Sequence, residues 1–160
     1  MKHLLRFADI IETIFVHVVG IVFIALITCT FVEVIFRYFL QNPLAWSEEL
    51  ARFLMVWMGF MGAAVCTKRE QHLQLGISIA RWINPRADRW VMVALNLAFM
   101  VFMVFLVKAG IDVCANTMEF RSPAMRLPMV YVLGVIPVTG ATMLLFNGVS
   151  LYRMIIIKGG

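Results

Sequence analysis

The chain has 160 residues, of which 62% are hydrophobic and only 14% are charged, and its mean hydropathy is +0.92. This composition excludes an ordinary water-soluble domain, in which about a quarter of the residues are charged. The formal net charge is +5, and the bias of basic residues toward one side of a membrane explains it without a nucleic-acid partner.

Uncharged stretches recur four times along the chain, at residues 14–32, 53–67, 90–107 and 127–152. Each is close to the roughly 20 residues that a helix needs to cross a hydrocarbon core of about 30 Å. We therefore predict an all-α integral membrane protein. It forms one four-helix membrane domain over residues 1–160, with spans at about 12–36, 48–67, 88–111 and 127–156.

The first span is expected to be retained, because the apolar run after Lys2 and Arg6 is too long for a secretion signal and no convincing cleavage site follows. Near the other end of this span, Glu33 precedes Arg37 by four residues, the favourable order for a helical ion pair. His17 is a notable polar residue inside the span, and we expect packing within the protein to satisfy it.

The second span opens with the sequence LAWSEELARF, residues 44–53. Ser47 is the expected N-cap, and acidic residues in a first turn complement the helix dipole. Trp46 is expected to anchor this helix at the membrane interface. Glu48 and Arg52 repeat the four-residue spacing of the first pair.

Two adjacent acids, Glu48 and Glu49, need not point the same way, since neighbouring residues differ by about 100° around a helix. We expect one of them to pair with Arg52, and the other to reach Arg37 across the short hairpin 37–49. The alternative is that the acids face away from the helices and steer a docking protein toward the membrane.

Small residues predict surfaces of close helix packing. Gly59 and Ala63 lie four residues apart, and Gly62 lies beside them, so the second span has a smooth face for the bundle or for a partner. In the fourth span we expect Gly134 and Pro137 to mark helix packing, and Pro137 to kink or loosen the helix.

The connection between the second and third spans reads EQHLQLGISIARWINPRADRW. Its apolar residues recur at helical spacing, which predicts an amphipathic helix at about 72–84 that lies on the membrane surface. Four side chains suit the headgroup level: Arg81, Trp82, Arg86 and Arg89. The alternative is a lateral contact for a partner protein.

Orientation follows from the distribution of the basic residues. The side that holds both termini and the middle loop carries nine of the 14 Lys and Arg residues, and the other side carries five. The positive-inside rule therefore places both termini in the cytoplasm, and the loops 37–49 and 108–126 outside.

No arrangement of residues indicates enzymatic chemistry or a cofactor. The three cysteines, Cys29, Cys66 and Cys114, are isolated, and the sequence contains no C-x-x-C motif, phosphate-binding loop or metal-ligand pattern. No charged residue is expected near the middle of the membrane, where it would indicate a substrate or ion site.

Two blocks resemble the small membrane subunit of tripartite ATP-independent periplasmic (TRAP) transporters. The more specific block is VEVIFRYFLQNPLAWSEELARFLMVWMGFMGAAVCTKREQHLQL, residues 32–75, and the weaker one is RSPAMRLPMVYVLGVIP, residues 121–137. The first block has an acid four residues before Arg37, then Trp46-x-Glu48-Glu49 with Arg52, and later Gly62-Ala63 and His72. Gly76 departs from the acidic or polar residue expected after the histidine.

The resemblance implies a non-catalytic scaffold subunit in a bacterial inner membrane. In this family a large multi-span subunit carries the substrate and sodium sites, and an extracytoplasmic binding protein delivers an organic acid. The small subunit packs beside the large one, surrounded by lipid, and helps to form the docking face, where Glu33 and the charged residues around Trp46 would contribute.

Two other functions fit the sequence less well. A small autonomous exporter would use Glu33 as a proton-coupled carboxylate, but Glu33 lies near the end of its span beside Arg37. An assembly subunit of an intramembrane redox enzyme is disfavoured by the lack of paired histidine or cysteine ligands.

Overall fold

The structure of the protein, a computed structural model, describes residues 2–73 and 85–157. Its helices are α1 (Lys2–Tyr38), α2 (Ala45–Leu73), α3 (Pro85–Asn116), α4 (Met129–Leu133) and α5 (Val135–Ile157). Within the described ranges there is no strand, only an isolated bridge between Arg121 and Pro128. Four helical segments are long and apolar enough to cross a membrane: Arg6–Tyr38, Ala45–Arg69, Val93–Asn116 and Met129–Val149. The predicted all-α, four-span fold is thus confirmed.

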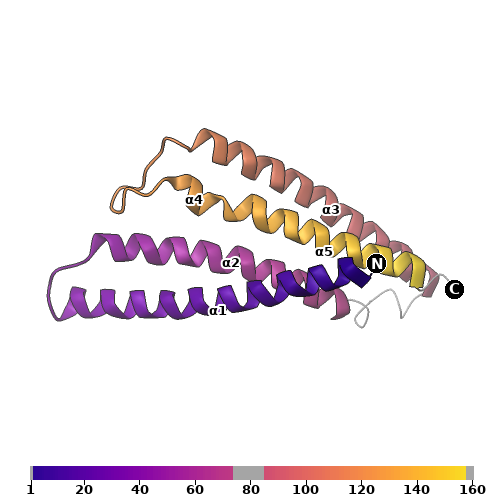
Figure 1. Cartoon of the computed structure of the whole chain (residues 1–160), viewed down its shortest axis with the longest axis horizontal. Helices are drawn as coiled ribbons and strands as arrows, with labels where there is room; N and C mark the ends of the chain where they lie inside the picture. The colour runs from indigo at the N-terminus through magenta and orange to yellow at the C-terminus, as the bar shows by residue number, and fades with distance from the viewer. Residues whose placement is uncertain (1, 74–84, 158–160) are drawn as a thin grey trace.

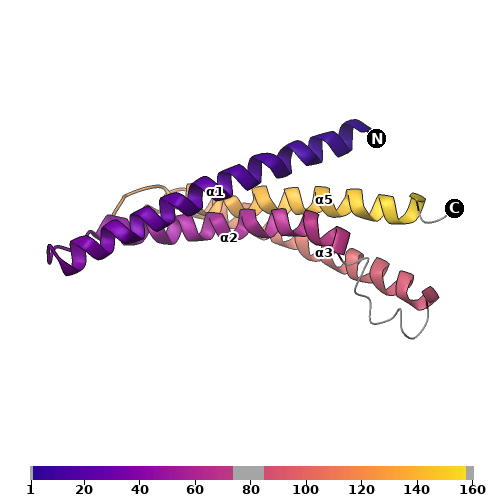
Figure 2. The same ribbon diagram turned by 90° about the horizontal axis from the view of Figure 1, so that it is seen from below.

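The four spans lie side by side in the order α1, α2, α5, α3 rather than closing into a square bundle (Figure 1). α1 packs along α2, α2 packs on α5, and α5 packs on α3. Among the described residues the backbone of α3 does not come close to that of α1 or α2, and the backbone of α1 comes close to that of α5 at only a few residues. α1 and α3 diverge at one end of the row, so the row is twisted (Figure 2).

The two ends of the row differ, and we name them by what they contain. The loop end holds the connections 39–44 and 117–128, and the terminal end is where α1 and α3 begin and α2 and α5 finish (Figure 1). At the loop end α1 stops in a left-handed turn. Gln41 has a φ of 52°, and the Asn42 N–H donates to the Phe36 carbonyl at 3.1 Å. This arrangement satisfies a carbonyl that the helix end would otherwise leave open.

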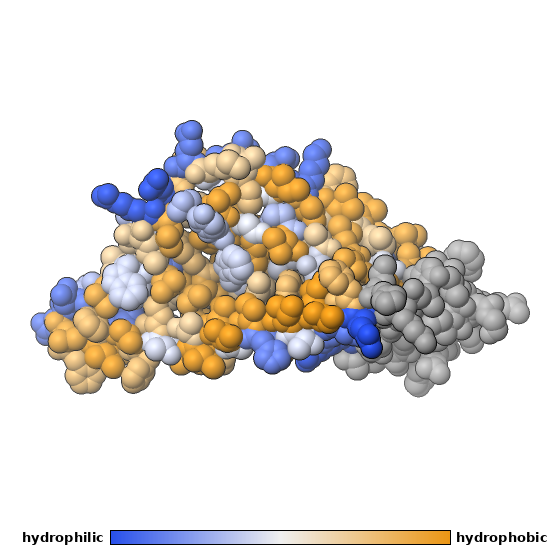
Figure 3. Space-filling view, in the orientation of Figure 1, coloured by the Kyte–Doolittle hydropathy of each residue, from blue (hydrophilic) through white to orange (hydrophobic). Residues whose placement is uncertain are grey.

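Apolar packing inside the chain is limited. A small core joins α2, α3 and α5 through Ala64, Met103 and Met143, with partly buried side chains around it. By contrast, none of the most apolar 18-residue window of α1 is buried. Apolar residues cover much of the face shown in Figure 3, including the part formed by α1. This exposure suits a lipid or protein environment and would be unfavourable in water.

Glycines of α3 and α5 allow these two helices to approach closely. A Cβ atom on Gly110 would lie 3.0 Å from both Ile136 Cγ2 and Pro137 Cδ, and one on Gly140 would lie 2.8 Å from Val107 Cγ2. A buried polar contact lies in the same interface, where the Asn147 amide donates to the Asn96 carbonyl oxygen at 3.1 Å. Gly110 was not predicted from the sequence as a packing residue, although it lies directly against Ile136 and Pro137.

The fourth span is interrupted at Gly134, between α4 and α5. Pro137 has no N–H to donate to the Leu133 carbonyl, so the regular hydrogen-bond ladder is broken at this turn. A Cβ atom on Gly134 would lie 2.9 Å from the Val130 carbonyl oxygen. Pro137 packs against Gly110 of α3, so it takes part in the contact between α3 and α5.

The small residues of α2 do not take part in this packing. Gly59 and Ala63 are exposed and Gly62 is half-buried, and a Cβ atom on either glycine would meet no atom within 4 Å. The smooth face is therefore open in this chain, and packing within the chain's own helices does not account for it.

The amphipathic helix predicted at about 72–84 falls almost entirely outside the described residues, as do Arg81 and Trp82. Leu73 is the last residue of α2, and Pro85 is the first residue of α3. Proline is well suited to a first helical position because its missing N–H would have no partner there. Arg86 and Arg89 belong to the first turns of α3.

Candidate interaction site at the loop end

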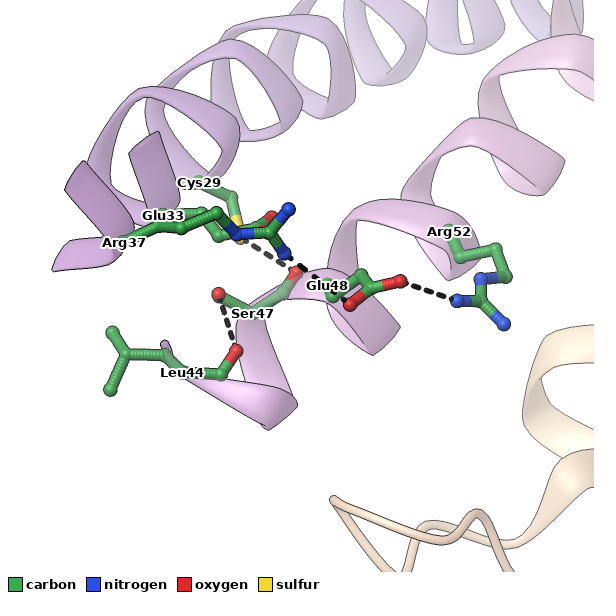
Figure 4. Close-up of polar contacts among 7 residues, drawn as sticks. All are labelled: Cys29, Glu33, Arg37, Leu44, Ser47, Glu48 and Arg52. Atoms are coloured by element: carbon green, nitrogen blue, oxygen red, sulfur yellow. Dashed lines mark hydrogen bonds and ion pairs between the residues drawn. The ribbon is translucent and has the colours of Figure 1, made fainter. Parts of the chain in front are cut away.

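A line of alternating charges joins α1 to α2 at the loop end (Figure 4). Arg37 Nη2 lies 2.6 Å from Glu33 Oε1 and 3.6 Å from Glu48 Oε2. The other carboxylate oxygen of Glu48 accepts from Arg52 Nη2 at 3.0 Å. The expected proximity of Arg37 to one of the two acids is thus observed, and Glu48 lies between two arginines.

These ion pairs differ in exposure. The Glu33 side chain is 13% exposed, whereas those of Arg37, Glu48 and Arg52 are 47%, 56% and 70% exposed. Exposed pairs contribute only about 0.2–1 kcal/mol each in water. The network therefore fixes how the α1–α2 hairpin closes more than it adds stability.

Ser47 does not act as the N-cap that the sequence predicted. Because α2 begins at Ala45, Ser47 lies within the first turn, where its buried hydroxyl donates to the Leu44 carbonyl at 2.8 Å. The Cys29 thiol of α1 donates to the Ser47 carbonyl at 3.3 Å (Figure 4). This position is consequently a contact between α1 and α2.

Glu49 has a different role from the one predicted for either acid. One of its carboxylate oxygens accepts two backbone hydrogen bonds from the connection between α3 and α4, at 3.0 Å from the Ala124 nitrogen and 2.7 Å from the Met125 nitrogen. Glu48 instead pairs with both Arg37 and Arg52, because the side chains of the two adjacent acids leave the helix in different directions. Glu49 thereby links the α1–α2 hairpin to the α3–α4 connection.

The turn that Glu49 binds is closed by its own hydrogen bonds. The buried Ser122 donates its N–H to the Leu127 carbonyl at 2.9 Å, and its hydroxyl accepts from the Leu127 N–H at 3.1 Å. Arg126 completes the turn with a φ of 54°. Two adjacent N–H groups pointing the same way form a suitable site for a carboxylate.

The loop end also carries large apolar side chains that are exposed. Trp46 is 46% exposed, and Tyr38 at the end of α1 and Phe39 directly after it are still more exposed. On the α3–α4 side, Phe120 and Tyr131 are also exposed. Aromatic residues beside charged ones are typical of the depth at which a membrane meets water.

A second charge cluster, at the terminal end, was not anticipated from the sequence. Lys68 Nζ of α2 lies 2.7 Å from both Asp9 Oδ1 and Glu12 Oε2 of α1, and Arg69 Nε donates to Glu12 at 3.0 Å. The Lys68 ammonium also lies 5.5 Å from the centre of the Phe146 ring. The sequence does contain a signal for this cluster. Asp9 and Glu12 lie three residues apart at one end of the first span, on the same side of the membrane as Lys68 and Arg69.

The chemistry of both clusters is that of ion pairs and backbone hydrogen bonds. Within residues 2–73 and 85–157, no group of three or more His, Cys, Asp or Glu side chains could hold a metal ion. The remaining predicted residues, Gly59, Gly62 and Ala63, lie along α2 away from these charges and form an open surface.

The similar proteins are all components of the same class of transporter. Residues 26–156 match the family described as tripartite ATP-independent periplasmic transporters, DctQ component. Over 101 residues the chain is 25% identical to a Haemophilus influenzae protein whose name is putative TRAP transporter small permease protein. The matched region covers 63% of this chain and 61% of the relative.

Two shorter matches involve sialic acid transporters. One is 44% identical over 39 residues to the sialic acid TRAP transporter small permease protein SiaQ of Vibrio cholerae, covering 24% of this chain and 22% of the relative. The other is 35% identical over 54 residues to the sialic acid TRAP transporter permease protein SiaT of Haemophilus influenzae, covering 34% and 9%. Each of these matches spans less than two thirds of the relative's length.

Proposed function

The chain belongs to the DctQ family of small TRAP transporter membrane subunits, and on this premise we propose that it is a non-catalytic scaffold for a large permease subunit. As a multi-pass membrane component of a transporter, it is a transport protein rather than an enzyme. The whole complex would import an organic acid with an ion gradient and without ATP, after an extracytoplasmic binding protein delivers the substrate.

The observation that carries this proposal is the open row of helices. A transporter that worked alone would need polar groups along a path through the membrane. Here the spans have no charged residue over 14–32, 53–67, 93–107 and 127–149, and their charged side chains gather toward the two ends. The open face at Gly59, Gly62 and Ala63 offers a smooth surface to a helix of the large subunit.

The autonomous exporter is disfavoured by the surroundings of Glu33. Its carboxylate lies 2.6 Å from Arg37, and this ion pair belongs to the network that joins α1 to α2. A proton-coupled carboxylate would be expected along a path through the membrane, whereas Glu33 lies near the end of its span, in the contact between two helices. Glu33 therefore has a structural role in this proposal.

The loop end is proposed to face the outside of the cytoplasmic membrane, with both termini in the cytoplasm, because most basic residues lie at the other side. The loop end then contributes to the surface on which the binding protein docks. A reporter that is active only outside the cytoplasm should be silent when fused after Gly160. Activity of that fusion would overturn this orientation.

The substrate class is proposed from the relatives. Two of them are sialic acid transporter proteins by name, which supports an organic acid without fixing which one. The residues that select the substrate are expected in the large subunit and in the binding protein, since the two charge clusters of this chain consist of ion pairs within the chain.

Co-purification tests the scaffold role. The tagged chain should retain the large permease subunit of its complex in detergent, and transport into proteoliposomes should require both chains. Gly62→Leu should reduce co-purification because it overfills the open face, whereas the matched control Gly62→Ala adds one methyl group into free space and should have little effect. Transport by this chain alone, or normal assembly of Gly62→Leu, would contradict the proposal.

A further inference from the structure

His17 lies on the face of α1 that is turned away from α2. The residues around it at helical spacing, Ile10, Ile14, Ile21, Ile24 and Phe31, are each more than half exposed. His17 is exposed as well. We call these six residues the outer stripe. Packing against the other helices of this chain does not bury His17, contrary to the expectation from the sequence.

The hydrogen bond that His17 makes determines which ring nitrogen is left over. His17 Nδ1 lies 2.7 Å from the Thr13 carbonyl oxygen. A carbonyl oxygen only accepts, so Nδ1 carries the hydrogen, and Nε2 of the neutral ring is a hydrogen-bond acceptor. No residue in the described part of the chain donates to Nε2.

The position along α1 places this nitrogen inside the membrane. Glu12 and Glu33, which belong to the charge clusters at the two ends, lie 21 residues apart. At 1.5 Å per residue this is about 31 Å, close to the thickness of a hydrocarbon core. His17 lies five residues beyond Glu12, or roughly 7 Å inside that boundary.

The imidazole of His17 indicates whether the outer stripe faces protein or lipid. The apolar residues of the stripe do not indicate this. Exposed isoleucines are as stable against lipid tails as against another helix. A polar atom without a partner is unfavourable in hydrocarbon. The Thr13 and Thr28 hydroxyls on the same side of α1 avoid this cost because they donate to the Asp9 and Ile24 carbonyls of their own helix.

We propose that the outer stripe is the contact surface for a transmembrane helix of the large permease subunit, and that this helix donates a hydrogen bond to His17 Nε2. The donor is a hydroxyl, an indole N–H or an amide N–H of a side chain. Gly20 stands beside the stripe, and a Cβ atom there would meet nothing within 4 Å, so a partner helix can approach α1 closely. This inference rests on the proposed function and assigns one face of α1 to the partner.

Photo-crosslinking from position 17 tests the contact directly. A benzoylphenylalanine at position 17 should form a covalent adduct with the large subunit in membranes that contain the full complex. Adducts with lipid alone would mean that His17 reaches the headgroups, and adducts with a second copy of this chain would mean a homo-oligomer. Either of these results, in a complex that still co-purifies, would overturn the inference.

Substitution tests the hydrogen bond itself. His17→Leu should weaken association with the large subunit by about 3- to 10-fold, the size expected for one interhelical hydrogen bond in a membrane. His17→Gln keeps an acceptor oxygen and should recover part of this loss. The control Val104→Leu changes an exposed residue of α3 outside the outer stripe and should leave association within about 2-fold. Equal association of His17→Leu and the unmodified chain would refute the hydrogen bond.

Two further measurements distinguish a loss of the contact with the large subunit from a loss of folding, and a failure of this inference from a failure of the proposed function. The isolated His17→Leu chain should unfold in detergent at the same temperature as the unmodified chain, because His17 bonds only to its own helix. A lower temperature would show that the residue acts within this chain and would refute the inference. If the unmodified chain retains no large subunit at all, the proposed function fails; if it does and position 17 never reaches that subunit, only this inference fails.

Discussion

Replacing Gly110 by alanine should destabilise the α3–α5 pair, although alanine is the better helix former. The added Cβ atom would lie 3.0 Å from Ile136 Cγ2, 3.0 Å from Pro137 Cδ and 3.2 Å from the Pro137 nitrogen. Carbon atoms in good contact are about 3.5–4.0 Å apart, so the two helices would have to separate by roughly 0.5–1 Å. Neither neighbour can rotate away, since one is β-branched and the other is a ring.

The expected cost is that of overpacking a tight contact, about 1–3 kcal/mol. Any gain in helix propensity, which is up to about 1 kcal/mol for Gly→Ala, opposes it. Gly148→Ala is the matched control, because it makes the same change within α5 at a site with no atom within 4 Å of the new Cβ. Comparing the two variants therefore removes the propensity term and leaves the clash.

The assay is unfolding of the purified chain by increasing mole fractions of a denaturing detergent, followed by tryptophan fluorescence. The free energy of unfolding of Gly110→Ala should lie about 1–3 kcal/mol below that of Gly148→Ala. If Gly110→Ala is as stable as Gly148→Ala, the close approach of α3 and α5 at this position is wrong, and the reasoning from Gly110 fails.

Three other outcomes are expected from the charged residues. Glu48→Arg should impair recovery of the transporter complex, and adding Arg37→Glu should restore it only partly, because the new acid at position 37 then faces Glu33; no rescue would favour a docking role for Glu48. Glu49→Ala should speed hydrogen exchange of the turn that Glu49 binds, with Glu49→Gln between it and the unmodified chain, and equal exchange in all three would contradict the contact. Lys68→Met should loosen the beginning of α1 in the same exchange experiment, and more than Arg69→Met does, because Lys68 is 15% exposed and pairs with two acids whereas Arg69 is 62% exposed. A larger effect of the Arg69 change would reverse the assigned importance of the two residues.

The sequence by itself determined what depends on near neighbours along the chain. Uncharged runs of membrane-spanning length predicted the four spans, because the cost of a charge in hydrocarbon is large and independent of which helices are neighbours. The pairs Glu33–Arg37 and Glu48–Arg52 followed from a four-residue spacing, since residues four apart share a face on any helix.

The tertiary structure alone decided which helices meet and where long-range contacts form. Glu49 binds N–H groups about 75 residues farther along the chain, and Lys68 pairs with Glu12 across α1 and α2. The same holds for Gly110 against Pro137, and for the open face at Gly62. The physical reason is that lipid tails are as apolar as leucine or isoleucine, so the apolar pattern of a membrane helix does not distinguish a packed face from a lipid-facing one.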